Sequence, residues 1–230
     1  IRSAFSCLEI VRVLYDHILQ PGDKFILSKG HGCLAQYVML AEKGYIKQDD
    51  LFKFCQDGAL LGGHPTAKIP GVHVATGSLG HGLPIGVGFA LAGYRTFVLM
   101  GDGECNEGSV WEAAMCASKH KLSNLTVIID YNEQQSYGST HEVLELEPLF
   151  KKWLDFGFTV MEIDGHDVSR LESFLNLTLA KYNRQPYALI CHTVKGKGIK
   201  FVEDNLRWHY RNDITDEEVK ALYEGLDNYA

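Results

Sequence analysis

Two residues with oxygen-bearing side chains each follow an apolar segment of this chain. Asp102 stands in a Gly-Asp-Gly turn directly after the run 96–100, and Asn132 follows the run 125–130. Both runs are typical of buried strands, and the segment between them has the pattern of a helix. In a parallel sheet both turns would open at the carboxyl edge, where ligands bind. The spacing therefore predicts that Asp102 and Asn132 lie close together at one edge of a sheet.

These side chains suit a hard cation that sits on a diphosphate. Mg²⁺ takes about six oxygen ligands, usually one or two from protein carboxylates or carbonyls and the rest from phosphate and water. Asp102, the Asn132 amide and a nearby main-chain carbonyl, which we assign to Gln134, would supply the protein share. Gly101 and Gly103 have no Cβ, so their backbone can lie against a phosphate, and the following helix offers N–H groups to an anion. A Gly-Asp-Gly turn is also common on protein surfaces, but its place between a strand and a helix favours the metal–diphosphate site.

Histidines stand at several points where the chain leaves regular structure. They are His31, His64, His81 and His209. Loops that leave strand ends can bring such residues together, and a histidine near a diphosphate and a sugar can donate hydrogen bonds to anionic oxygen and relay protons. A loop histidine can equally be a polar surface residue. For His31 and His64, each of which follows a glycine, we favour function.

Other kinds of site have weaker support. A zinc site could pair His31 with Cys33 or His120 with Cys116, but no spacing resembles a structural zinc site and no further ligands are evident. The G-x-S-x-G elbow of serine hydrolases is absent. The run from Lys195 to Gly198 lacks the full spacing of a nucleotide-binding phosphate loop.

The overall composition indicates one large globular domain over residues 1–230. The chain has 46% hydrophobic and 22% charged residues, and its formal charge of −7 argues against a general nucleic-acid binder. The six cysteines form no C-x-x-C pair and read as reduced core residues, with Cys105 the one closest to the Asp102 turn. No apolar run is long enough to span a bilayer and no signal peptide is evident, so we expect a cytoplasmic location.

Strand and helix patterns alternate along the chain, which predicts an α/β fold with a mostly parallel sheet flanked by helices on both faces. Helices are expected at 6–19, 33–43, after Gln48, and at 82–93, 108–120, 168–182 and 215–224, and strands at 24–27, 96–100, 125–130, 158–163 and 187–193. The stretch 60–82 is rich in glycine and histidine and has little periodicity, which is typical of a functional loop. Gly82, Gly86 and Ala90 form a small-residue stripe that allows close packing, either inside the chain or between subunits.

Several motifs follow one another in a fixed order. They are Ser28-Lys-Gly-His31, the run Pro70–Gly82, Gly101-Asp-Gly-Glu-Cys-Asn-Glu-Gly108, Asp130-Tyr-Asn132, Asp164-Gly-His-Asp167, and Thr193-Val-Lys-Gly-Lys-Gly198 leading to Trp208-His209. Together they resemble the N-terminal, diphosphate-binding half of the transketolase family, in the split form that is encoded as two subunits. The resemblance covers essentially the whole chain and implies the thiamine-diphosphate-binding fold.

The resemblance also implies a set of site residues. Thiamine diphosphate would be held through Mg²⁺, or Ca²⁺ or Mn²⁺ in its place, by Asp102, Asn132 and the Gln134 carbonyl. The remaining cofactor contacts would come from His31, Gly103 and His209 at the diphosphate and from the backbones of Gly77 and Leu79 at the rings. His64 would lie near the substrate, and Glu107 would sit at the subunit interface in a carboxylate network between active sites. The candidate catalytic residues are therefore His31, His64, His209 and Glu107.

Two motifs are given a structural role. We expect Asp164–Asp167 to be a strand-end turn, and we expect Lys195 and Lys197 to shape the loop that brings His209 inward.

An enzyme of this family transfers a two-carbon ketol unit from a ketose to an aldehyde, with the cofactor as electron sink. The glutamate that activates the aminopyrimidine lies on a pyrimidine-binding domain, and nothing after Thr193 is long enough to form one. The resemblance therefore implies a half-enzyme that works with a C-terminal transketolase subunit, which would carry that domain and glutamate, in an α2β2 assembly. A related thiamine-dependent synthase, making deoxyxylulose phosphate or serving secondary metabolism, and a non-catalytic scaffold subunit remain alternatives.

The chain departs from the family pattern at two places. Arg2-Ser3 stand where two glycines are expected after a His-Ile pair, and the chain begins at Ile1, so we expect that His in a preceding segment. Arg2 would then crowd the substrate entrance, where it could bind a carboxylate or phosphate and change the preferred substrate. Tyr210 stands where a glycine commonly follows the Trp-His pair, which affects the placement of His209.

Overall fold

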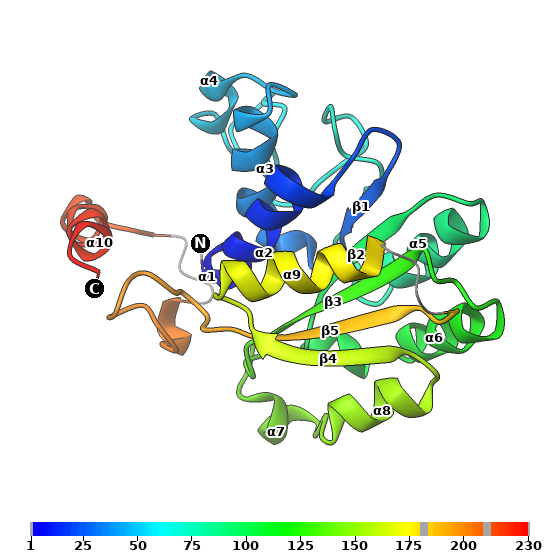
Figure 1. Cartoon of the computed structure of the whole chain (residues 1–230). Helices are drawn as coiled ribbons and strands as arrows, with labels where there is room; N and C mark the ends of the chain where they lie inside the picture. The colour runs from blue at the N-terminus through cyan, green and yellow to red at the C-terminus, as the bar shows by residue number, and fades with distance from the viewer. Residues whose placement is uncertain (1, 180–183, 209–212, 230) are drawn as a thin grey trace.

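The computed structural model describes residues 2–179, 184–208 and 213–229. A parallel five-stranded sheet forms its centre, with the strands in the order β1-β2-β3-β5-β4 (Figure 1). The strands are β1 (Lys24–Leu27), β2 (Thr96–Gly101), β3 (Leu125–Tyr131), β4 (Thr159–Asp164) and β5 (Tyr187–His192). The inner strands β2, β3 and β5 are almost entirely buried, as continuous apolar runs require when both faces of a sheet are covered.

Helices cover both faces of this sheet, which confirms the predicted fold class. One face packs against α5 (Gly82–Leu91), α6 (Gly108–Lys119) and α8 (Leu149–Asp155) through Val98 and Val127 of the sheet. The other packs against α2 (Leu8–Val13), α3 (Cys33–Glu42) and α9 (Val168–Leu179) through Phe97, Leu99 and Ile128. Successive residues of β2 therefore enter opposite cores, as side-chain alternation along a strand dictates.

The remaining elements are short, apart from the last helix. They are α1 (Arg2–Phe5), the π-helical turn η1 (Leu14–Ile18), η2 (Gly30–Gly32), α4 (Gln48–Leu51), η3 (Gly103–Asn106), α7 (Thr140–Val143), η4 (Leu206–Trp208) and α10 (Asp216–Asp227). The expected helix at 6–19 is thus α2 continued by η1. The stretch 60–82 contains no helix or strand before α5 begins, as predicted. No helix in the described ranges is both long and apolar enough to cross a membrane.

The small-residue stripe of α5 faces the sheet. A Cβ added to Gly86 would lie 2.5 Å from Cγ2 of Val98, and Ala90 is buried in the same core. Gly88, which points elsewhere, has nothing within 4 Å of such a Cβ. The stripe therefore serves close packing of α5 on β2, which decides between the two roles considered for it.

The carboxyl ends of four strands meet at one edge of the sheet. Gly101 of β2 pairs with Asp130 of β3, and Tyr131 of β3 pairs with His192 of β5. The loops after β1, β2, β3 and β5 consequently begin side by side, and they contain most of the residues singled out in the sequence.

Candidate active site

Asp102 is the first residue after β2 and is only 2% exposed. Its carboxylate accepts hydrogen bonds from the backbone N–H groups of Gly103 at 2.6 Å, Asn132 at 2.9 Å and Glu133 at 2.6 Å. Burial and the nearby carboxylate of Asp130 raise the pKa of Asp102, while these N–H donors oppose that rise. The turn after β2 and the start of the loop after β3 are therefore tied together by one carboxylate.

The loop after β3 brings two more oxygens to this edge. Asn132 is buried, its Nδ2 donates to the carbonyl of Asp130 at 3.2 Å, and its Oδ1 accepts from the N–H of Gln134 at 3.2 Å. The carbonyl of Gln134 accepts a hydrogen bond from the Nζ of Lys195 at 2.8 Å. The expectation that Asp102, Asn132 and Gln134 belong to neighbouring loops is confirmed, whereas metal binding by them stays a prediction.

Lys195 is a site residue that the sequence reasoning assigned to loop shape alone. It is 4% exposed, and burial lowers its pKa, as does the ammonium of Lys29, while the carboxylates of Asp102 and Asp130 raise it. Its ammonium therefore stands among the expected metal and diphosphate ligands. A lysine that closely follows a strand at the ligand-binding edge was the available signal. Lys197 is different, because its Nζ lies over the ring of Tyr229.

A buried ion pair lies in the same region. Lys29 and Asp130 form a salt bridge in which both side chains are no more than 2% exposed, and Asp130 also accepts hydrogen bonds from Ser6 at 2.6 Å and from Thr193. Burial would raise the pKa of Asp130, but Lys29 and the two hydroxyls outweigh it and hold that pKa low. The network joins the start of the chain, the loop after β1, β3 and the loop after β5.

Glu104 connects three loops and was not singled out in the sequence. Its carboxylate accepts hydrogen bonds from the hydroxyl of Ser28, from the N–H of Gly80 at 2.8 Å and from the N–H of Gly101 at 3.4 Å. Burial raises the pKa of Glu104, and these three donors oppose that rise. The carboxylate fixes the glycine-rich stretch 60–82 against the ends of β1 and β2.

Other predicted residues lie on the loops that Glu104 joins. His31 is exposed on η2, at the end of β1, and the exposed His64 lies against Gly77, whose added Cβ would be 3.6 Å from Cδ2 of that ring. The carbonyl of Leu79 lies 3.1 Å from Nδ1 of His81. Glu107 is exposed at the start of α6, beside Gly80. His209 and Tyr210 lie outside the described residues.

The position of Arg2 corrects the expectation that it stands open at a substrate entrance. Its side chain is 2% exposed, and its Nη2 donates to Oε1 of Gln134 at 2.8 Å and to the carbonyl of Lys195 at 3.5 Å. Because α1 packs on η2, the guanidinium is directed into the loops after β3 and β5 instead of into solvent.

Two other expectations concern structural residues. His166 of the Asp164–Asp167 motif accepts a hydrogen bond from the N–H of Val194 at 2.9 Å and lies 3.1 Å from the carboxylate of Glu9, which agrees with a strand-end turn. Cys105 is buried, and burial raises its pKa, so it is a core residue. All six cysteines are free thiols.

The residues at this edge fit a metal–diphosphate group. The three expected ligands are a carboxylate, an amide oxygen and a carbonyl, which are hard donors that suit Mg²⁺. The Nε2 of Gln135 is buried and has no hydrogen-bond partner among the described residues, and its side chain lies over Gly103. An added Cβ on Gly101 would meet no atom within 4 Å, so the backbone there is open to a ligand. A buried donor without an acceptor, next to an open glycine turn, suits an anionic oxygen.

A group of three or more His, Cys, Asp or Glu side chains arranged to hold a metal is not found among the described residues. The Asp102–Asn132–Gln134 set contains one carboxylate and two neutral oxygens, so it is a different kind of site from the zinc alternative.

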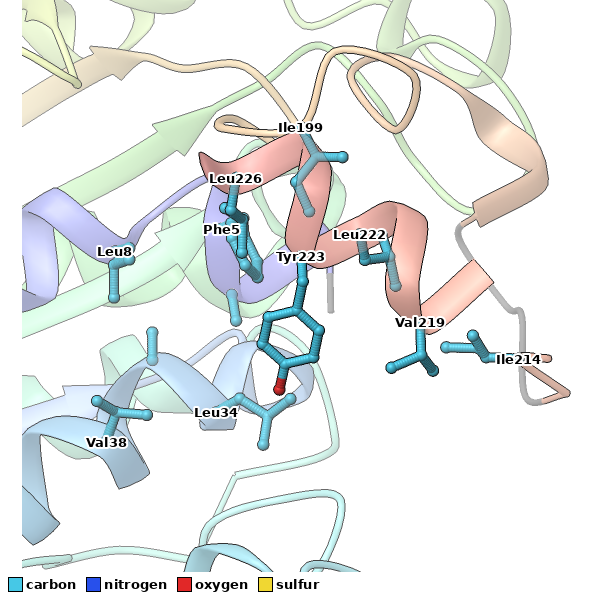
Figure 2. A pocket seen from close by; sticks show the side chains of 12 residues that line it. Phe5, Leu8, Leu34, Val38, Ile199, Ile214, Val219, Leu222, Tyr223 and Leu226 are labelled. Carbon is cyan, nitrogen blue, oxygen red and sulfur yellow. The ribbon is translucent and has the colours of Figure 1, made fainter. Parts of the chain in front are cut away.

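A separate apolar cavity of about 390 Å³ lies between α10 and the N-terminal helices. Figure 2 shows Leu222 and Tyr223 of α10 facing Phe5 and Leu34 across it. None of the predicted site residues lines this cavity, and its walls have almost no polar groups, so it does not suit a charged cofactor.

Comparisons with known proteins agree with the arrangement of this edge. Residues 14–227 match the family model described as transketolase, thiamine diphosphate binding domain. One of the two kinds of subunit of the apulose-4-phosphate transketolase of Phocaeicola vulgatus is 40% identical, in an alignment that covers 95% of this chain and 83% of the relative. A 6-deoxy-6-sulfo-D-fructose transketolase subunit of a Clostridium species is 36% identical, with coverage of 97% and 86%.

Solved structures show the same fold. The chain superposes on transketolase from Campylobacter jejuni with a TM-score of 0.79 and 27% identity, covering 90% of this chain and 38% of that one. For the Pichia stipitis transketolase complex with sedoheptulose-7-phosphate the TM-score is 0.82 at 26% identity, with coverage of 98% and 40%. The chain thus spans about two fifths of each of these solved chains.

Proposed function

Because the chain belongs to the transketolase family through its thiamine diphosphate binding domain, we propose that it is the cofactor-binding subunit of a split transketolase. The enzyme would transfer a two-carbon ketol unit from a ketose to an aldehyde. Residues 1–230 would form one diphosphate-binding domain. The observation that supports this most strongly is the meeting of Asp102, Asn132 and the Gln134 carbonyl beside the unpaired amide of Gln135.

Each of these groups has a role in holding the cofactor. Asp102, Asn132 and the Gln134 carbonyl would bind Mg²⁺, and the diphosphate would accept hydrogen bonds from Gln135 and contact the open backbone at Gly101 and Gly103. Lys195 would add a positive charge on the same side. When bound, thiamine diphosphate would supply the electron sink for breaking and forming a carbon–carbon bond.

The histidines and the glycine-rich loop would serve the cofactor rings and the substrate. His31 and His209 would contact the diphosphate, the backbones of Gly77 and Leu79 would line the rings, and His64, which lies against Gly77, would move protons at substrate hydroxyls. By joining Gly80 to β2, Glu104 would hold this loop at a fixed distance from the metal ligands.

A second subunit would complete the active site. The chain matches 83% and 86% of two relatives named as transketolase subunits, but only 38% and 40% of the two solved transketolase chains. The rest of such a chain, including the pyrimidine-binding domain with its activating glutamate, would be the partner, in an α2β2 assembly with Glu107 at the interface. The free cysteines agree with a cytoplasmic setting.

Reconstitution with the partner subunit tests this function. The chain, the partner and an equimolar mixture would be assayed with thiamine diphosphate, Mg²⁺, an aldehyde acceptor and a set of anionic ketoses, including apulose-4-phosphate and 6-deoxy-6-sulfo-D-fructose. We expect ketol transfer in the mixture alone, and its loss in Asp102→Asn but not in Asp16→Asn. Transfer by either protein in isolation would contradict the division of the site, and no transfer from any ketose would contradict the function.

A further inference from the structure

Gln134 is held through every polar group it has. Its side-chain Oε1 accepts a hydrogen bond from Nη2 of Arg2 at 2.8 Å, and its Nε2 donates to Oδ1 of Asp204 at 3.0 Å. Its N–H donates to Oδ1 of Asn132 at 3.2 Å, and its carbonyl accepts from Nζ of Lys195 at 2.8 Å. Two of the three expected metal-binding oxygens, Asn132 Oδ1 and the Gln134 carbonyl, are thus contacted by or part of Gln134.

The side-chain contacts close into a ring. The carbonyl of Lys195 accepts hydrogen bonds from the N–H of Asp204 at 3.1 Å and from Nη2 of Arg2 at 3.5 Å. Contacts therefore run from Arg2 to Gln134, on to Asp204 and Lys195, and back to Arg2. This ring joins α1 to the loops after β3 and β5.

We propose that Arg2 and Asp204 are positioning residues that clamp the Gln134 side chain and thereby aim the Gln134 carbonyl and the Asn132 amide at the metal. The inference rests on the proposed function and adds to it a set of outer contacts that tune metal affinity. Groups that fix a metal ligand from outside commonly change affinity by about 10- to 100-fold when they are removed. Neither residue would touch the cofactor or the substrate.

Fold stability does not account for Arg2. Its Nε and Nη1 are buried and have no hydrogen-bond partner among the described residues. Burial lowers the pKa of the Arg2 guanidinium, and the carboxylate of Asp204 opposes this. A buried charge with unpaired donors destabilises a fold, and replacing it by an apolar side chain of similar length is often neutral or stabilising. The structure therefore predicts that metal affinity and stability respond differently to loss of Arg2.

The test uses the full chain in complex with its partner subunit, as Arg2→Met, Asp204→Gly and the control Arg12→Met. Asp204 has a φ of 52°, which glycine adopts without strain, so this variant folds even if Arg2→Met does not. Arg12 is 70% exposed, and its side chain pairs with Asp16 on the same helical segment, away from the ring. Calorimetry would give the Mg²⁺ concentration that half-saturates thiamine diphosphate binding, and thermal melts without metal would give Tm.

We expect Arg2→Met and Asp204→Gly to need about 10- to 100-fold more Mg²⁺, with a metal-free Tm that is unchanged or higher for Arg2→Met. Arg12→Met should match the wild type. Gln134→Leu keeps its carbonyl but loses both side-chain contacts, so adding Arg2→Met to it should weaken binding no further.

Three results would overturn the inference. They are wild-type Mg²⁺ dependence in Arg2→Met and Asp204→Gly, a full additional effect of Arg2→Met in the Gln134→Leu background, or a loss of affinity that follows a fall in metal-free Tm. A wild-type complex that binds no thiamine diphosphate would instead contradict the proposed function, so the two failures are distinguishable.

Discussion

The Nζ of Lys195 lies 2.8 Å from the carbonyl oxygen of Gln134, so a buried ammonium contacts an oxygen that the proposed metal site uses. The contact joins the loops after β5 and β3, and the carboxylate of Asp102 raises the pKa of this lysine against the effect of burial. A positive charge is therefore built into the site before any cation binds.

Lys195→Met should weaken the binding of thiamine diphosphate with Mg²⁺ by about tenfold or more, because a charge-assisted hydrogen bond contributes about 1.5–3 kcal/mol. The matched control is Lys197→Met, whose ammonium lies over the ring of Tyr229 in the wild type, although it belongs to the same loop. Calorimetry on both variants checks this. Equal affinities in the two variants would show that Lys195 shapes the loop and does nothing more.

Lys29→Met should destabilise the fold by about 3–5 kcal/mol, because it leaves the Asp130 carboxylate buried without its cation. Lys151 also pairs with a carboxylate, that of Asp155, but both side chains are more than half exposed. Lys151→Met should therefore cost less than about 1 kcal/mol. Urea unfolding measures both, and a small loss for Lys29→Met would mean that Ser6 and Thr193 suffice to hold Asp130.

Two glycines of α5 should respond to the same substitution with opposite signs. Gly86→Ala places a methyl group 2.5 Å from Cγ2 of Val98 and should destabilise the chain by about 1–3 kcal/mol through overpacking. Gly88→Ala meets nothing within 4 Å and should stabilise it by about 0.5–1 kcal/mol through helix propensity. Thermal melts of the two variants decide whether the stripe packs on the sheet, and a destabilised Gly88→Ala with a tolerated Gly86→Ala would reverse that assignment.

The sequence predicted the elements well where the patterns were strong. The strands at 24–27, 96–100 and 125–130 were found within one residue, because buried parallel strands are continuous apolar runs. The helices α7 and α8 were not predicted, since their short segments have too few turns to show a periodic pattern. Asp102, Asn132 and Gln134 were correctly expected to lie on neighbouring loops, because strand ends in a parallel sheet share one edge.

The residues that support these turns were harder to predict. Glu104, Gln135 and Lys195 act through contacts made only when separate loops meet, and no spacing within one loop reveals them. Arg2 was placed wrongly for the same reason. Its position near the start of the chain suggested exposure, whereas its main hydrogen-bond partner is 132 residues away.

The most direct test of the account is calorimetric titration of thiamine diphosphate into the complex with its partner, with and without Mg²⁺, using the wild type, Asp102→Asn and the control Asp16→Asn. The site predicts binding that requires Mg²⁺ in the wild type and in Asp16→Asn. In Asp102→Asn the affinity should fall by about 100-fold, because the only carboxylate of the ligand set is lost. Burial and Asp130 disfavour a charge at Asp102, so this variant should keep its metal-free Tm. Equal affinities in the wild type and Asp102→Asn, or no binding in the complex, would contradict the account.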